Sequence, residues 1–207
     1  MSGPQFPWEE PLGVRPHGEG SVSVRVWAPR AERVAIRIGG TSHALDDVGY
    51  GMRAGVVPGR VGDDYDFVLD GEDGFPDPLS RWQPEGLRGP SRVYAVPEAT
   101  RGPGPGVHLA SAVLYELHVG TFSREGTFDA AIEHLAALRS LGVTAIEVMP
   151  VAEFPGRHGW GYDGVYLAAA QSSYGGPEGF RRLVDAAHAE GLAVVLDLVL
   201  NHLGASG

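Results

Sequence analysis

Three polar side chains stand at the end of a strongly apolar stretch, where they could bind a hydroxyl-rich ligand. Asp197 is the single charged residue in the run 192–199, and Asn201 and His202 follow directly after it. A run of this kind predicts a strand covered on both faces, as in a parallel sheet. Ligands bind at the carboxyl ends of such strands in open α/β sheets and in (β/α)8 barrels. The alternative is structural: Asp197 would cap the next turn, and the Asn-His pair would be solvated.

A second segment with chemical potential is the long stretch 150–176, which carries aromatic rings, polar groups and many glycines. An aromatic ring presents an apolar face to the C–H side of a sugar, while a carboxylate or an imidazole can bind its hydroxyls. Connections of this length are usually functional, although an Ω-loop packed by its own aromatics would have a similar composition. We expect Gly159, Gly161 and Gly164 to let the backbone turn tightly around a ligand. The side chains in question are those of His158, Trp160, Tyr162, Asp163, Tyr166 and Tyr174.

The elements that would position these residues alternate between strands and helices from residue 112 onward. Short apolar runs predict strands at 112–119, 143–149 and 192–199. Apolar residues at helical spacing predict a helix over 127–141, with Thr127 as its N-cap, and a second helix from Pro177 to Gly191. This order gives parallel strands with helices packed outside them. It amounts to about three-eighths of a (β/α)8 barrel, so we expect the front of a longer protein with one uncovered flank.

The first half of the chain has a different period. Residues 21–28, 33–38 and 64–70 alternate between apolar and polar, and residues 50–57 predict a weaker strand. Short strands separated by turn residues predict a β-sandwich at roughly 15–95. Residues 1–20 would be a partly ordered lead-in. Residues 77–78 and 84–90 would form an irregular exit over the surface. Trp27 and Tyr50 are possible sugar platforms, with burial in the core or at a domain interface as the competing interpretation for Trp27.

The fold class predicted is therefore multidomain, β plus α/β. Residues 1–95 would form an immunoglobulin-like β-sandwich of the carbohydrate-binding-module type. Residues 96–111, with the sequence RGPGPG at 101–106, would be a linker. Residues 112–207 would be the first three βα units of an incomplete (β/α)8 TIM barrel.

Composition narrows the classes of ligand. The 207 residues carry a formal net charge of −10, which disfavours nucleic acid and anionic membrane surfaces, since both bind basic faces. A neutral, hydroxyl-rich ligand is compatible with this charge. The sequence has no Cys, so it can form neither disulfides nor thiolate metal sites. We expect a cytoplasmic protein that binds neither nucleic acid nor membrane; its oligomeric state is left open.

Four segments together resemble the α-amylase superfamily of glycoside hydrolases. They read LYELHVGTF at 114–122, GVTAIEVMPVAEF at 142–154, HGWGYDGV at 158–165 and DLVLNHLG at 197–204. Within the superfamily, the chain is most similar to the branch that releases trehalose from maltooligosyl trehalose. Isoamylase-type debranching enzymes, glycogen branching enzymes and a non-catalytic glucan-binding module are the alternatives. The resemblance covers essentially the whole chain.

The resemblance implies roles for individual residues. Asp197 would brace the mouth of the barrel, and Asn201 would support the loop that carries His202. His202 would hydrogen-bond the glucose at the scissile bond, on which Tyr162 would stack. Asp163 would make polar contacts or hold its loop, and Trp160 is a weaker candidate for substrate binding. The branch named above requires no metal, so neither a metal nor a cofactor is expected.

The reaction of this superfamily needs a nucleophilic carboxylate and an acid/base carboxylate about 5 Å apart. The resemblance places both after later strands of the barrel. No catalytic residue is therefore assigned here, and the 207-residue chain is expected to be inactive. Glu116 and Glu147, which share alternation faces with His118 and Met149, are expected to form a buried polar layer. The expected ligands are maltooligosaccharides or maltooligosyl trehalose.

Overall fold

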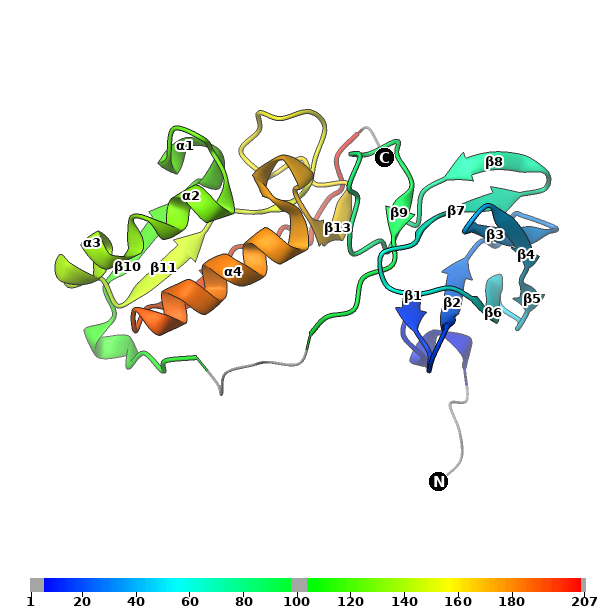
Figure 1. Ribbon diagram of the computed structural model, residues 1–207, viewed down its shortest axis with the longest axis horizontal. Coiled ribbons are helices and arrows are strands. Elements are labelled where there is room, and N and C mark those ends of the chain that lie inside the picture. Colours follow the sequence, from blue (N-terminus) through cyan, green and yellow to red (C-terminus); the bar gives the residue numbers. More distant parts are fainter. Residues whose placement is uncertain (1–5, 98–103, 206–207) are drawn as a thin grey trace, which may run out of the picture. The chain divides into compact units, whose positions relative to one another are not determined.

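The computed structural model describes residues 6–97 and 104–205, except for the side chains of Pro7 and Asp73. The chain divides between Val96 and Pro97 into two compact units, called unit 1 and unit 2 below (Figure 1). Residues 98–103 of the predicted linker, 96–111, lie outside the described residues. Residues 1–5 of the predicted lead-in do so too.

Unit 1 consists of short antiparallel strands arranged in two sheets. One sheet has the order β1-β2-β6-β5, and the other has the order β4-β3-β7-β8 with β9 paired to β7. A 3-10 helix, η1 (Pro7–Glu9), precedes them. The strands are β1 (Gly13–Pro16), β2 (Ser21–Trp27), β3 (Val34–Ile38), β4 (Thr41–Ala44), β5 (Asp46–Asp47), β6 (Met52–Pro58), β7 (Asp64–Leu69), β8 (Glu72–Phe75) and β9 (Ser91–Arg92).

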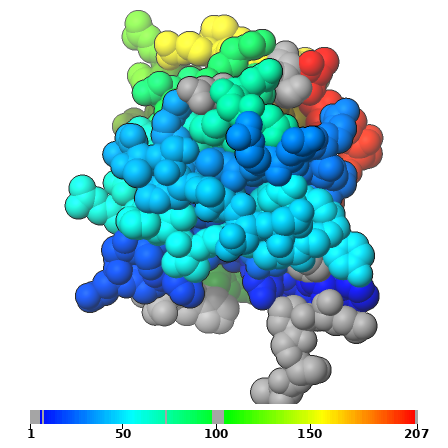
Figure 2. Space-filling model, turned by 90° about the vertical axis from the view of Figure 1, so that its right-hand side faces the viewer, coloured from blue at the N-terminus to red at the C-terminus, as the bar shows by residue number. Residues whose placement is uncertain are grey.

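Both sheets of unit 1 contribute side chains to one hydrophobic core. Val22 and Val24 of β2 are fully buried, as is Ile36 of β3, while their sequence neighbours face outward. The alternation predicted for these strands is confirmed. Figure 2 shows atoms of this unit, coloured from blue to cyan along the sequence.

The flanks of unit 1 are more ordered than predicted. The supposed lead-in contains β1, which pairs along its length with β2. The predicted exit has no helix or strand and no buried residue over 84–90, but Asp77 of the same exit is buried, as are Gln83 and Ser91 beside it. These polar groups satisfy one another: Tyr65 donates to Asp77, the Asp77 amide donates to Ser91, and Ser91 donates to Gln83. Short polar side chains gave no periodic signal from which this burial could be read.

Unit 2 is built around three parallel strands in the order β10-β11-β14, as predicted. The segment expected to be one long loop contains a short antiparallel pair, β12 with β13. No helix in the described part of the chain is long and apolar enough to cross a bilayer. The elements of unit 2 are η2 (Leu109–Ser111), β10 (Leu114–Leu117), α1 (Val119–Phe122), α2 (Phe128–Ile132), α3 (Leu135–Ser140), β11 (Ala145–Val148), β12 (Ala152–Glu153), β13 (Tyr166–Ala170), η3 (Ser172–Tyr174), α4 (Gly176–Ala189) and β14 (Ala193–Leu196).

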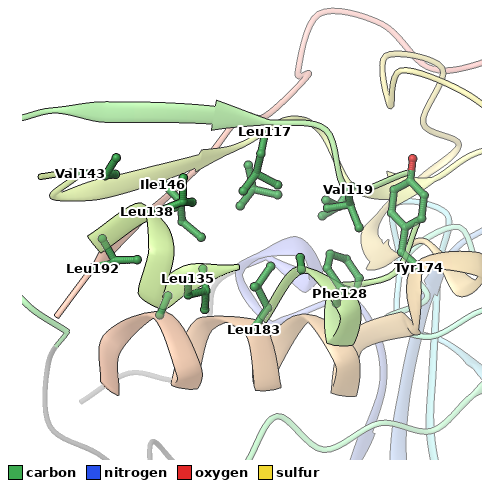
Figure 3. Close-up of a cluster of buried hydrophobic side chains, with 14 of the residues drawn as sticks. Leu117, Val119, Phe128, Leu135, Leu138, Val143, Ile146, Tyr174, Leu183 and Leu192 are labelled. Carbon is green, nitrogen blue, oxygen red and sulfur yellow. The ribbon is translucent and has the colours of Figure 1, made fainter. Parts of the chain in front are cut away.

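The helices of unit 2 cover one face of the parallel sheet. Figure 3 shows Leu117 and Ile146 pointing from the strands toward α4, where Leu183 meets them. On the opposite face, Glu116, Glu147 and Val195 lie side by side in register. Glu116 and Val195 are exposed there. The predictions of a β14 covered on both faces and of a buried Glu layer are therefore wrong, while the predicted uncovered flank is observed.

The first predicted helix of unit 2 is divided into α2 and α3, with a break at residues 133–134. Leu138 is buried as expected, but Leu141 is 79% exposed because the helix has already ended. Gly142 follows with φ +93°, and the Val143 amide bonds to the Leu138 carbonyl, which closes the helix end.

Thr127 caps α2, as predicted: its side-chain oxygen accepts a hydrogen bond from the Ala130 amide at 3.2 Å. Thr127→Ala leaves this amide without its partner and should lower the free energy of unfolding by about 1 kcal/mol. Thr127→Ser keeps the hydroxyl and should restore most of the loss. Urea unfolding of the three proteins measures this; equal stability of the Ala and Ser variants would show that the cap contributes nothing.

Candidate functional site

The candidate site of unit 2 forms where two distant segments meet at the carboxyl end of β14. Tyr162 Oη donates to Asp197 Oδ2 at 3.0 Å. This bond joins residues 161–164, called the GYDG loop below, to the residue directly after the strand. Asp197 is positioned by the sheet itself, because its amide bonds to the Val148 carbonyl of β11. Two residues predicted from separate motifs are thus in direct contact.

His202 joins the same cluster from the segment that follows. Its Nε2 lies 2.7 Å from the Tyr162 carbonyl oxygen. Since a carbonyl only accepts, Nε2 carries the proton, and Nδ1 is left with no partner within the described residues. The Gly204 amide donates to the Gly164 carbonyl at 2.9 Å, so residues 202–204 run against the loop and fix it. An exposed Nδ1 acceptor beside an aromatic ring suits a ligand rich in hydroxyls.

Three glycines let this loop pack closely against the protein. A Cβ on Gly161, at φ +89°, would lie 1.9 Å from the Pro150 carbonyl oxygen, and one on Gly164 would lie 2.7 Å from the Ala152 methyl. A Cβ on Gly159 would touch the Phe154 ring at 3.0 Å. Gly159 also lines the cleft described below, so the expectation that these glycines let the backbone turn around a ligand stays a prediction. They let the loop approach the chain around β12 closely enough for Tyr162 to reach Asp197.

Negative charge surrounds the Tyr162 hydroxyl. The hydrogen bond to Asp197 is the largest of the influences that raise the pKa of the Tyr162 phenol, followed by its partial desolvation and by the charges of Asp197, Glu116 and Glu147. The phenol therefore stays protonated and keeps its role as a donor to Asp197. Tyr162 is 37% exposed, so part of its ring remains open to a ligand.

A cleft of about 390 Å³ lies at the ends of β10 and β11. Four of its lining residues, 157–160, directly precede the GYDG loop in the sequence. Trp160 is among the residues that line it and is 75% exposed, whereas Tyr162 and His202 are not among those residues. The predicted site residues therefore divide between the cleft and the Tyr162–Asp197–His202 cluster. The cleft is lined by His118, Gly120, Thr121, Met149, Arg157, His158, Gly159, Trp160 and Tyr174.

His118 is one of the cleft residues that sequence reasoning did not assign to the site. Its Nε2 lies 2.7 Å from the Gly159 carbonyl, so it donates there, and its Nδ1 faces the Thr121 hydroxyl at 3.0 Å. The Tyr174 hydroxyl lies 3.1 Å from the same Nε2. His118 follows β10 as Asp197 follows β14, so the rule that pointed to Asp197 would also have found His118.

A buried carboxyl group, that of Glu153, helps to hold the GYDG loop in place. Glu153 of β12 is 1% exposed and accepts hydrogen bonds from the Ser172 amide at 2.6 Å and from the Ser172 hydroxyl at 3.0 Å. Burial raises the pKa of Glu153 to about 7, against the lowering effect of the Ser172 bonds. Because the Val165 amide also bonds to the Glu153 carbonyl, this residue ties the end of the GYDG loop to η3.

Asn201 and Asp163 are less engaged than the resemblance implies. The side chain of Asn201 is exposed and makes no hydrogen bond within residues 6–97 and 104–205. The Asp163 side chain is exposed too, while its carbonyl packs against Gly204, where a Cβ would come within 2.2 Å. Within these residues no group of three His, Asp or Glu side chains could hold a metal ion.

Comparison with known proteins assigns the class. Residues 83–206 match the family described as Alpha amylase, catalytic domain. This match covers more than half of the chain, which therefore belongs to the α-amylase family, and the resemblance read from the motifs is confirmed.

Two curated relatives and one solved structure are similar to this chain over most of its length. Malto-oligosyltrehalose trehalohydrolase of Saccharolobus solfataricus is 48% identical over 193 residues, covering 91% of this chain and 34% of the relative. The 1,4-alpha-glucan branching enzyme GlgB of Cereibacter sphaeroides is 35% identical over 216 residues, covering 92% and 30%. A crystal structure of a protein from Salmonella typhimurium, provisionally described as an alpha amylase, superposes with a TM-score of 0.90 at 45% identity, covering 95% of this chain and 34% of that one. The chain thus spans about a third of the length of the relatives it matches.

Proposed function

We propose that this chain is part of a retaining glycoside hydrolase that acts on α-1,4-glucan and releases trehalose from maltooligosyl trehalose. Unit 2 would supply the first three βα units of a (β/α)8 barrel, covering residues 112–207. Unit 1 would be an immunoglobulin-like sandwich over residues 1–95, joined through 96–111. The single observation that carries the proposal is the contact of Tyr162 with Asp197, to which His202 is joined, at the carboxyl end of a parallel strand.

In this proposal the cluster holds the glucose ring beside the bond to be cut. The open part of the Tyr162 ring stacks on the apolar face of that glucose, and His202 Nδ1 accepts from one of its hydroxyls. Asp197 holds the Tyr162 hydroxyl and so fixes the ring. Trp160, Asp163 and Asn201 would add contacts from the loops around the cluster. The ligand would be a maltooligosaccharide or maltooligosyl trehalose.

Glycogen branching is the competing function, because a branching enzyme is also a relative over most of this chain. Both functions use α-1,4-glucan and would place a glucose on Tyr162. They differ in the acceptor, which is water for hydrolysis and a glucan hydroxyl for branching. The higher identity to a trehalohydrolase, 48% against 35%, favours hydrolysis.

Tyr162→Ala should weaken the binding of maltotriose to the 207-residue chain roughly tenfold, equivalent to about 1.4 kcal/mol. The change removes the stacking surface and the tie to Asp197 together. Tyr162→Phe keeps the ring and loses only the hydroxyl, so it should weaken binding by less. Chemical-shift titrations of the three proteins measure this. Leu167→Ala, at an exposed leucine of β13, is the control and should bind as the wild type does.

Two outcomes would contradict the proposal. Equal maltotriose affinity of the wild type and Tyr162→Ala would show that the Tyr162 ring does not contact the ligand. Trehalose release from maltooligosyl trehalose by the 207-residue chain would contradict the assignment of both catalytic carboxylates to later strands. If such release were seen and Glu147→Gln abolished it, the in-register pair Glu116–Glu147 would be its source.

A further inference from the structure

The cleft at the ends of β10 and β11 differs in charge from the rest of the chain. Within residues 6–97 and 104–205, no Asp or Glu is among its lining residues, although the sequence has 26 of these residues against 16 Lys and Arg. Its ionisable side chains are those of His118, Arg157, His158 and Tyr174. Burial raises the pKa of the Tyr174 phenol, which therefore stays neutral. The cleft is thus a place without negative charge on a protein whose net charge is −10.

Part of the polar lining is already bonded to itself. His118 Nε2 donates to the Gly159 carbonyl at 2.7 Å, and the Tyr174 hydroxyl lies 3.4 Å from the same carbonyl oxygen. His118 Nδ1 accepts from the Thr121 hydroxyl at 3.0 Å. A Cβ on Gly120 would lie 2.9 Å from the Tyr174 hydroxyl oxygen, so these groups are closely packed. They hold the shape of the cleft, and recognition of a ligand falls to the remaining polar groups.

The remaining polar groups are the side chains of Arg157 and His158. Both are exposed, and neither makes a hydrogen bond or an ion pair in the part of the chain that the structure describes. A guanidinium offers five N–H donors in a planar fork and no acceptor, which matches two oxygens of a phosphate or a carboxylate. The imidazole of His158 adds a ring N–H next to it in the chain. The groups left free for a ligand are therefore chiefly donors, and an acceptor-rich anion complements them.

An apolar surface adjoins these donors. The Trp160 ring is 75% exposed, and Met149 also lines the cleft. The cleft volume of about 390 Å³ lies within the range of sites for small organic molecules, about 300–1,000 Å³. Inorganic phosphate alone would leave the indole ring and much of this space unused. The lining therefore suits an anion that is attached to a small organic body.

We propose that this cleft is a binding site for a small phosphate monoester. The Arg157 fork takes two oxygens of the phosphate, His158 donates to a third, and the body of the ester lies against the Trp160 ring. Phosphate is favoured over a carboxylate because it has a third oxygen for the second donor and carries up to about two negative charges at neutral pH. Neutral glucan is the weaker candidate, since sugar hydroxyls need acceptors as well as donors, and no carboxylate is among the described lining residues. The proposal does not depend on which ligand the Tyr162 cluster binds.

The test follows the Trp160 indole N–H signal of the 207-residue chain by NMR during titration with glucose 6-phosphate, glucose or inorganic phosphate. Glucose 6-phosphate should shift this signal with a Kd of about 1 mM or below. Glucose lacks the anion and phosphate lacks the organic body, so each should bind roughly tenfold more weakly. Raising the ionic strength from about 0.01 M to about 0.1 M shortens the Debye length from about 30 Å to about 10 Å and should weaken binding of the ester.

Variants of Arg157 test its role in this site. Arg157→Gln removes the charge and the fork and should weaken glucose 6-phosphate binding roughly tenfold. Arg157→Lys keeps the charge without the fork, so its loss should be smaller. Arg181→Gln is the matched control, because it removes the same charge from an exposed ion pair with Asp185 on α4, and Arg181 is not among the residues that line the cleft. It should bind the ester as the wild type does.

The outcomes separate this proposal from the proposed function. Tyr162→Ala should leave glucose 6-phosphate binding intact, and Arg157→Gln should leave maltotriose binding at Tyr162 intact. Absence of any shift of the Trp160 signal at about 10 mM glucose 6-phosphate would overturn the phosphate site alone. Equal affinities for glucose and glucose 6-phosphate would overturn it too, because the cleft would then recognise the sugar without the anion. An Arg157→Gln variant that binds the ester as tightly as the wild type would have the same consequence.

Discussion

Gly161→Ala is expected to lower the stability of the GYDG loop by about 2–5 kcal/mol and to weaken maltotriose binding about as much as Tyr162→Ala does. Two effects add. The residue has φ +89°, which an L side chain tolerates poorly, and its Cβ would lie 1.9 Å from the Pro150 carbonyl oxygen. A backbone atom cannot swing aside as the end of a flexible side chain can. The loop must therefore withdraw, and the Tyr162–Asp197 bond at 3.0 Å should break with it.

Gly156 provides a matched control in the same segment. It has φ +78°, and a Cβ there would meet no atom within 4 Å. Gly156→Ala therefore carries the conformational cost without the collision and should destabilise by about 1 kcal/mol. Hydrogen exchange at the Val165 and Gly204 amides, which close the loop, would report the difference. Similar protection of these amides in both variants would show that the contact with Pro150 does not hold the loop.

The sequence located the parts of this site but not their mutual geometry. Apolar periodicity revealed the strand before Asp197, and its carboxyl end is where α/β folds bind ligands. Nothing in the spacing of Tyr162 and Asp197, 35 residues apart, indicates that one donates to the other. That contact depends on Gly161 and Gly164 packing against protein backbone and methyl groups. A glycine-rich sequence has the same appearance whether its glycines face a ligand or the rest of the chain.

The alternation of apolar and polar residues also did not predict which polar groups are buried. Alternation finds strands because apolar and polar residues differ in hydrophobicity, and it found β2, β3 and β7. It is silent where a polar residue is buried with a partner, as with Asp77 bonded to Tyr65. For Trp27, alternation was right: it placed this residue on the same face as Ser23 and Arg25, and the ring is exposed. The hydrophobic pattern failed where polar side chains are buried with partners.

Glu153→Gln is expected to remove a pH dependence of about 3 kcal/mol from the stability of unit 2. The pKa of this carboxyl rises from 4.5 to about 7 because the group is buried. Between these values the folded protein keeps a proton that the unfolded chain has lost, so folding takes up a proton. The stabilisation is complete below about pH 4.5 and is lost as the pH rises from there to about 7. Gln cannot ionise, so the variant should not show this loss.

The measurement must separate the two units, because Asp77 of unit 1 is also buried with a raised pKa and adds a slope of the same sign. Urea unfolding followed through the methyl signals of Leu183 and Leu192, which belong to the core of unit 2, isolates the effect of Glu153. Ser172→Ala is a second control, since it removes a hydroxyl that favours the charged form and should raise the pKa of Glu153 further. The slope between pH 4.5 and 7 should then persist to higher pH. If the wild type and Glu153→Gln lose stability equally over this range, the carboxyl of Glu153 is not the cause of the pH dependence of the stability of unit 2.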